Sequence, residues 1–330
     1  MTVEELAKLI DGDIMGYRNA EINGIGTMES AEKDELVFAF RKVAIEKIHE
    51  TKSKIIISRP LFYLKNDKTF IFTLKSMEEV FYTVMQALAR EKEIREPMEG
   101  FRGEGCVLEE GSYVHKNSYI GANTVVSPGV VIEKNVKIGD NCVIHPNAVI
   151  KEDSILGDGA IIDSGACIGA EPFRAVRLKN RMINVKGLKG VSIGDGSFIG
   201  ANTSIEKGVL LTTIIGKFCT IGGIVTIAHD CRVGDNVRMV SQTGIAGECT
   251  VGNNTMMYGQ VGVADKINIG NNVTIFAKSG VRSDIADNKS VSGIPAIDHR
   301  DNLKLMVSQR KEFSNYAKRK KKNTGSGEHK

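Results

Sequence analysis

Aliphatic residues recur at every sixth position over most of the chain. The first run is unbroken from Leu108 to Ile168, the period returns at Ile193, and after a slip of four residues it continues from Ile215 to Val281. An α-helix repeats at about 3.6 residues and a strand at about 2, so neither explains this period. A short strand followed by a corner, repeated three times, closes a coil of about 18 residues, which is the pattern of a hexapeptide β-helix.

The residue two places before each aliphatic supports this interpretation, because it should also face the narrow interior of the coil. These residues are small or β-branched and carry no charge, as shown by Cys106, Ser112, Thr124, Ala148 and Ala160. The pattern therefore predicts a mainly β fold, a left-handed parallel β-helix of hexapeptide repeats.

The period divides the chain into three parts. Residues 1–100 lack it and are predicted to form a small α/β domain, residues 101–292 form the β-helix, and residues 293–330 form a C-terminal helix with a basic flexible tail. Residues 171–190 interrupt a coil, and such an insertion can only be a loop that leaves the helix at a corner. Long loops within compact repeats are often functional.

Short apolar runs indicate the elements of the first domain. Strands are predicted at Ala20 to Ile25, Lys54 to Ser58 and Thr69 to Leu74. A helix is predicted from Val3 to Ile10, and a longer one follows Ser76, which is spaced to form a capping box with Glu79.

Composition limits the function classes. The chain has 330 residues, 42% hydrophobic and 25% charged, as in ordinary globular proteins. Five of its six cysteines occupy the small-residue positions of the repeat, so we expect reduced, buried thiols and no metal site. We find neither a signal-like N-terminus nor about 20 consecutive apolar residues, so we expect a cytoplasmic protein with no transmembrane segment.

The net charge of +4 is unevenly distributed, because residues 318–322 are all Lys or Arg. This basic run is either a solvated terminus or a contact for an acidic carrier protein or an anionic membrane surface. We do not expect nucleic-acid binding, since no aromatic platform or helix-turn-helix pattern accompanies the charge.

Several motifs, in order, resemble those of one family. They are Ile-Ala-His-Asp at 227–230, Gln-Thr-Gly-Ile-Ala-Gly at 242–247, Gly-Gln-Val-Gly-Val-Ala at 259–264, Ile-Gly-Ala-Asn-Thr at 199–203 and Ser-Gly-Ile-Pro at 292–295. Together with Gly24, Ile25 and Phe38, they resemble the UDP-3-O-acylglucosamine N-acyltransferases of lipid A synthesis. The resemblance extends over nearly the whole chain and leaves out only the tail.

The resemblance implies a homotrimeric enzyme. It would move a 3-hydroxyacyl group from the phosphopantetheine thioester of acyl carrier protein to the amino group of a nucleotide-linked sugar, with no bound cofactor. His229 matches the general base of the family, and imidazole is suited to accept the proton that the amine loses. Gly247 lies 18 residues later, one coil along, and matches the glycine whose N–H stabilises the oxyanion. Asp265 is the next residue in this column.

The chain departs from the family at its recognition positions. Lys266 stands where the family has a second histidine, and Gly222 and Gly223 replace an Asp and an Asn. Of the three residues that hold uracil in the family, Phe38 is kept, while Arg41 and Ala44 replace an Asn and a Tyr. These changes suggest an altered acceptor.

Two groups of binding residues are predicted. For the acceptor or its nucleotide we expect Phe38, Arg41, Phe173, Arg174, Asp265 and Lys266. For the acidic carrier we expect Lys278 and Arg282 near the last coils, together with the basic tail.

Two other functions stay open. A coenzyme A-dependent sugar acetyltransferase could use the same coils, and it would prefer short acyl thioesters. A non-catalytic trimeric β-helix, serving as a scaffold or binding protein, could have kept His229 by descent. In that case His229→Ala would leave the cellular function intact.

Overall fold

A small N-terminal unit precedes the repeats. The computed structural model describes residues 1–40, 46–60, 67–94 and 97–324. The unit has a five-stranded sheet in the order β1-β5-β4-β3-β2, in which β1 pairs antiparallel with β5 and the other strands are parallel. Its elements are α1 (Val3–Leu9), β1 (Gly12–Met15), β2 (Gly24–Ile25), β3 (Glu35–Ala39), the 3-10 helix η1 (Lys47–His49), β4 (Ile55–Ser58), β5 (Thr69–Thr73) and α3 (Met77–Ile94).

Both helices begin at side-chain caps. Thr2 and Glu5 form a reciprocal capping box at the start of α1, and the Glu79 N–H donates to Ser76 Oγ at 3.2 Å before α3. The predicted strand from Ala20 to Ile25 is wrong in length, since only Gly24–Ile25 is a strand. β1 and β3 were not predicted.

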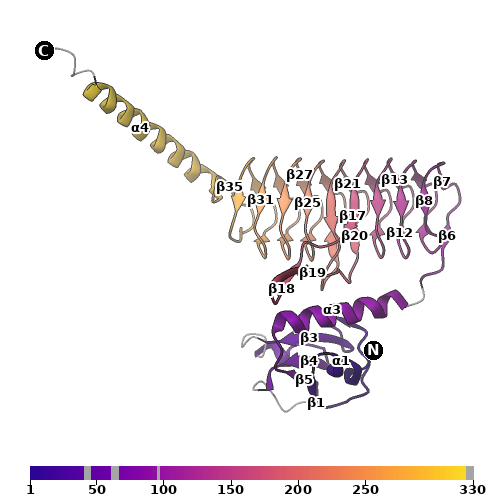
Figure 1. Cartoon of the computed structure of the whole chain (residues 1–330). Helices are drawn as coiled ribbons and strands as arrows, with labels where there is room; N and C mark the ends of the chain where they lie inside the picture. The colour runs from indigo at the N-terminus through magenta and orange to yellow at the C-terminus, as the bar shows by residue number, and fades with distance from the viewer. Residues whose placement is uncertain (41–45, 61–66, 95–96, 325–330) are drawn as a thin grey trace.

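The coils form a left-handed parallel β-helix, as the six-residue period predicts. Each coil contributes one short strand to each of three faces, and the faces run the length of the helix (Figure 1).

The first face contains β7 (Val107–Leu108), β10 (Val125–Val126), β13 (Val143–Ile144), β16 (Ile161–Ile162), β21 (Phe198–Ile199), β24 (Thr220–Ile221), β27 (Arg238–Met239), β30 (Met256–Met257), β33 (Thr274–Ile275), β35 (Ser290–Ser292) and, antiparallel at its end, β36 (Ile297–Asp298). The second face contains β8 (Tyr113–Val114), β11 (Val131–Ile132), β14 (Val149–Ile150), β17 (Cys167–Ala170), β22 (Ser204–Glu206), β25 (Thr226–Ile227), β28 (Gly244–Ile245), β31 (Gly262–Val263) and β34 (Gly280–Val281). The third face contains β6 (Phe101–Arg102), β9 (Tyr119–Ile120), β12 (Lys137–Ile138), β15 (Ile155–Leu156), β20 (Val191–Ile193), β23 (Thr213–Ile215), β26 (Arg232–Val233), β29 (Thr250–Val251) and β32 (Asn268–Ile269).

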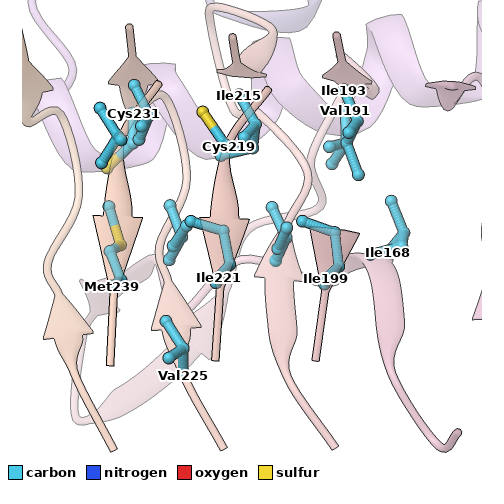
Figure 2. Packing of buried hydrophobic residues seen from close by; sticks show 14 of the residues in the cluster. Ile168, Val191, Ile193, Ile199, Ile215, Cys219, Ile221, Val225, Cys231 and Met239 are labelled. Carbon is cyan, nitrogen blue, oxygen red and sulfur yellow. The ribbon is translucent and has the colours of Figure 1, made fainter. Parts of the chain in front are cut away.

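The periodic aliphatic residues stack inside the coils. Ile199 is in register with Ile221, which is in register with Met239, and all three are buried. Figure 2 shows this column beside Cys219 and Cys231 of the small-residue positions. All six cysteines are free thiols. The interior is therefore the continuous apolar core that the sequence predicts.

The insertion at 171–190 forms a hairpin that reaches the N-terminal unit. Its strands are β18 (Ala175–Leu178) and β19 (Arg181–Asn184), paired antiparallel. Figure 1 shows the hairpin projecting from the coils toward α3, and its Val176 joins Val80 and Val84 of α3 in one hydrophobic cluster. The inserted hairpin thus fixes the N-terminal unit beside the coils.

The chain continues into α4 (His299–Thr324), which leaves the end of the β-helix and points away from it (Figure 1). The His299 ring stacks on Phe276 with centroids 3.9 Å apart, and Asn302 donates to Ser292 Oγ at 2.8 Å. Among the described residues, no helix is both long and apolar enough to cross a membrane.

Candidate active site

His229 lies at the corner that joins β25 to β26. Although it lies at a corner, His229 is only 6% exposed. Neighbouring groups on three sides account for this burial: the next residue in the chain, the end of β22, and the following coil.

The carboxylate of Asp230 holds the His229 ring from one side. Its Oδ2 lies 2.8 Å from His229 Nδ1. Its Oδ1 accepts hydrogen bonds from three successive backbone N–H groups, those of Val209, Leu210 and Leu211, at 3.0, 2.9 and 2.7 Å. Such a cluster of N–H groups compensates a buried negative charge. Asp230 is thereby fixed, and it fixes the imidazole.

The N–H cluster belongs to the place where the six-residue period slips. Residues 207–212, which we call the slip segment, lie between β22 and β23 and contain the four extra residues of that coil. The slip segment folds back toward the next coil, so its N–H groups meet Asp230. The sequence shows the slip, and Asp230 lies in the 227–230 motif, but neither was given a role from the sequence.

Glu206, at the end of β22, was also missed. Its Oε2 accepts the N–H of His229 at 3.1 Å and the N–H of Phe173, in the inserted loop, at 3.1 Å. The side chain is itself buried, at 8% exposure. One carboxylate therefore ties the His229 coil to the inserted loop.

Lys207, next along the chain, anchors the same region. Its ammonium lies 2.8 Å from Glu171 and 3.4 Å from Glu152. Burial opposes its charge, but hydrogen bonding and attraction from these carboxylates outweigh burial and raise the pKa of Lys207. Burial also opposes the charge of Glu152, but Lys207 and Lys92 outweigh it and lower the pKa of that carboxyl.

Gly247 lies against the other side of the imidazole. A Cβ atom there would come within 2.7 Å of His229 Cε1, so the position admits no side chain while the ring stays in place. The Gly247 N–H donates to no group within the described part of the chain. At other corners the corresponding N–H is used within the protein. The Ala122 N–H donates to Asp140 Oδ1 at 2.7 Å, and the Lys217 N–H donates to Asp235 Oδ1 at 2.8 Å. The backbone N–H of Gly247 is therefore available to donate a hydrogen bond to a ligand.

An open groove of about 890 Å³ runs from His229 along the second face. Gly244, Gly262 and Gly280 form part of its lining, at outward positions of β28, β31 and β34. A Cβ on Gly244 or Gly262 would meet no atom of the described structure within 4 Å. Packing does not require glycine at these two positions; its effect is to keep the groove open.

Most of the predicted site residues line this groove. They are His229, Gly247, Phe173, Arg174, Asp265 and Arg282. Lys266 and Lys278 are exposed nearby and are not part of the lining. Arg41 lies outside the described residues.

Phe38 does not line the groove, but a series of contacts connects it to the groove. Its ring is 5.6 Å from that of Phe81, and the Arg174 guanidinium lies 5.9 Å from the Phe81 ring centroid. Arg174 also lies 3.7 Å from Glu248, which lines the groove. Aromatic residues of the N-terminal unit are thereby connected to the rim of the groove. The described residues contain no cluster of His, Cys, Asp or Glu suited to a metal ion.

Two hexapeptide-repeat family models match the chain. The bacterial transferase hexapeptide (six repeats) matches residues 135–170, and the hexapeptide repeat of succinyl-transferase matches residues 116–146 and 190–223.

Curated relatives are similar over part of their length. A UDP-3-O-acylglucosamine N-acyltransferase of Fusobacterium nucleatum is 51% identical over 146 residues, which are 44% of this chain and 44% of that protein. One from Ectopseudomonas mendocina is 40% identical over 81 residues, 24% of this chain and 23% of the relative. The matches thus span less than half of these relatives.

Solved acyltransferases share the fold. The UDP-N-acetylglucosamine O-acyltransferase of Moraxella catarrhalis superposes with a TM-score of 0.54 at 27% identity, covering 59% of this chain and 74% of that one. The UDP-N-acetylglucosamine acyltransferase of Bacteroides fragilis gives 0.53 at 29% identity, covering 58% and 73%. The chain therefore shares hexapeptide repeats and a β-helix with these acyltransferases, and over less than half of its length it is similar to UDP-3-O-acylglucosamine N-acyltransferases.

Proposed function

We propose that the protein is an acyltransferase of lipid A synthesis that moves a 3-hydroxyacyl group from acyl carrier protein to the amino group of a nucleotide-linked amino sugar. The observation that carries this proposal is the His229 ring, held between Asp230 and Gly247 at one end of an open groove. The relatives supply the reaction class, and the geometry suggests a role for each residue.

In this proposal His229 is the general base. The Nδ1–H donates to Asp230, which leaves Nε2 unprotonated and able to accept the amine proton. The amine nitrogen forms a bond to the thioester carbon, the carbon–sulfur bond breaks, and the proton on His229 passes to the departing thiolate. Asp230 stabilises the imidazolium that forms between these steps.

Gly247 supplies the second element of the reaction. Attack on a thioester places negative charge on its carbonyl oxygen, and an aligned N–H donor lowers the energy of that state by a few kcal/mol. The Gly247 N–H donates to no group in the described structure, and the residue lies against the His229 ring. A carbonyl carbon beside His229 would therefore have a donor within reach.

The groove suggests how the two substrates approach. Its glycine-lined part along β28, β31 and β34 suits a long, unbranched thioester arm, and Arg282 lies at that end. At the His229 end, Arg174 and the contact chain to Phe38 suit a nucleotide. Acyl carrier protein is acidic, so Arg282, Lys278 and the basic run at 318–322 would attract it. Both substrates belong to the cytoplasm, where we place the reaction.

A homotrimer is part of the proposal. The coils before the inserted loop carry apolar outward residues on two adjacent faces: Val107, Val125, Val143 and Ile161 on the first, and Tyr113, Val131 and Val149 on the second. Contiguous apolar surface of this kind usually marks a protein interface. Association there would leave the groove in the later coils for the substrates.

The test is to supply purified protein with acyl donors and UDP-linked amino sugars and to identify products by mass spectrometry. We expect N-acylated sugar from long-chain 3-hydroxyacyl carrier protein, and little from acetyl coenzyme A. Faster transfer from short coenzyme A thioesters would replace this proposal with the acetyltransferase. No transfer from any donor would favour a binding protein.

A further inference from the structure

A second cavity, which we call the cleft, lies between the N-terminal unit and the third face of the β-helix. It has a volume of about 620 Å³ and shares no lining residue with the groove. Its walls come from β2, the end of α3, Met98, strands β12 and β15, and residues 188–190 and 212. A cavity of this size at a domain junction is typical of small-molecule sites.

The charges that line the cleft do not cancel. Lys92 is paired with Asp153, Lys189 lies 2.8 Å from Glu35, and Glu91 lies 3.3 Å from the amino group of Met1. The remaining cation is Lys137, which is exposed and forms no ion pair within the described part of the chain. One positive charge is therefore left for an occupant.

The cleft also presents apolar surface. Ile155 points outward from β15 and is 46% exposed. Leu88, Met98 and Leu188 line the same cavity. An exposed isoleucine beside an unpaired lysine suits a molecule with both an apolar portion and a negative charge.

One wall of the cleft is continuous with the segment that holds Asp230. Gly190 lines the cleft, and its carbonyl accepts the N–H of Thr213 at 3.3 Å. Thr213 Oγ1 accepts the Asp230 N–H at 3.0 Å. Thr212 also lines the cleft, and it directly follows Leu211, whose N–H donates to Asp230 Oδ1. An occupant that contacts Gly190 and Thr212 would therefore restrict the slip segment.

We propose that the cleft binds a small anionic molecule with an apolar portion, and that this binding orders the slip segment that positions Asp230. The consequence for catalysis rests on the proposed function, but the binding and the ordering do not. Both can be measured without an acyl-transfer assay.

The binding test uses the anionic fluorescent dye 8-anilinonaphthalene-1-sulfonate as the probe, titrated into the full chain. Gly262→Trp serves as the background, because it fills the groove and removes dye bound there. In that background Lys137→Glu should weaken dye binding at least about tenfold, since it turns an attraction into a repulsion. The matched control is Lys289→Glu, an equal charge change at an exposed lysine outside the cleft. It should leave affinity unchanged.

The ordering test is amide hydrogen exchange on the same proteins. Saturating dye should slow exchange in residues 209–211 of the Gly262→Trp protein, and should not do so when Lys137→Glu is added. Equal dye affinity with and without Lys137→Glu would overturn the site. Dye binding that depends on Lys137 but leaves exchange in 209–211 unchanged would overturn the coupling. A thermal melt of each variant excludes misfolding as the cause.

Discussion

At the residue scale, the site depends on how a buried imidazole is oriented. Asp230 makes five hydrogen bonds: one with His229, three from the slip segment and one from its own N–H to Thr213. These hydrogen bonds leave the Asp230 carboxylate little freedom to move. As an acceptor at His229 Nδ1, it favours the tautomer that carries the proton on Nδ1.

We expect Asp230→Ala to lower kcat by about 10²-fold or more, because the ring loses both its orientation and the charge that stabilises its protonated form. Steady-state kinetics would measure this, with KM for the acceptor much less affected. Asp235→Ala is the matched control: Asp235 also accepts a corner N–H, from Lys217 at 2.8 Å, but it does not line the groove. An Asp230→Ala enzyme with unchanged kcat would remove Asp230 from the mechanism.

Backbone strain at the corner residue Ile224 can be tested by measuring the free energy of unfolding. Ile224 has φ of +58° and is 60% exposed, at a corner where most other coils have Gly, Asn or Gln. A β-branched residue is disfavoured there by about 1 kcal/mol. Ile224→Asn should therefore raise the free energy of unfolding by about that amount, measured by denaturant titration. The reverse change at Asn236, which has φ of +56°, should lower it. No gain from Ile224→Asn would show that Ile224 has compensating contacts, for example with a partner subunit.

At the element scale, the inserted hairpin and the slip segment place the site. Lys207 connects them to the coils through Glu171 and Glu152. The lowered pKa of Glu152 means that its contribution to stability is present above its ordinary value of 4.5 and is lost as pH falls through the lower folded value. The raised pKa of Lys207 means that its contribution is present below 10.5 and is lost as pH rises through the higher folded value.

We therefore expect Lys207→Met to destabilise the protein by about 2 kcal/mol near neutral pH, because the half-buried Glu152 and the exposed Glu171 lose their shared, buried cation. The difference from the unmodified protein should shrink below about pH 4.5, where Glu152 protonates in the unfolded chain. Thermal melts across pH would measure it, with Lys304→Met on exposed α4 as the control. A difference that stays constant down to pH 3 would contradict this ion pair.

Much of the β-helix follows from the sequence, while the N-terminal sheet and the site follow only in part. Stacked coils repeat one local rule, so counting by 18 placed Gly247 beside His229. β3 was missed because its burial does not alternate, with Leu36, Val37 and Ala39 all buried, so it lacks the two-residue period of a half-buried strand. The roles of Glu206 and Asp230 were not predicted, because they depend on how the slip segment folds back, where the period gives no information.

At the scale of the whole molecule, the early and the later coils of the β-helix differ in the residues that point outward. Its early coils carry Val131 and Val149 on the second face, and its later coils carry glycines and the groove on the same face. We expect sedimentation equilibrium to give a trimer of the 35.9 kDa chain. Val131→Glu should shift it toward monomer, and Thr250→Glu, on the third face, should not. A monomer at micromolar concentration in the unmodified protein would contradict the proposed assembly.

The central claim is that His229 removes the amine proton during acyl transfer. The most direct measurement is the single-turnover rate of labelled 3-hydroxyacyl transfer from acyl carrier protein to a UDP-linked amino sugar, with the unmodified protein and with His229→Ala at saturating acceptor. The account predicts that the rate falls by about 10²- to 10⁴-fold while the folded structure is kept. Transfer by His229→Ala at the unmodified rate would contradict it.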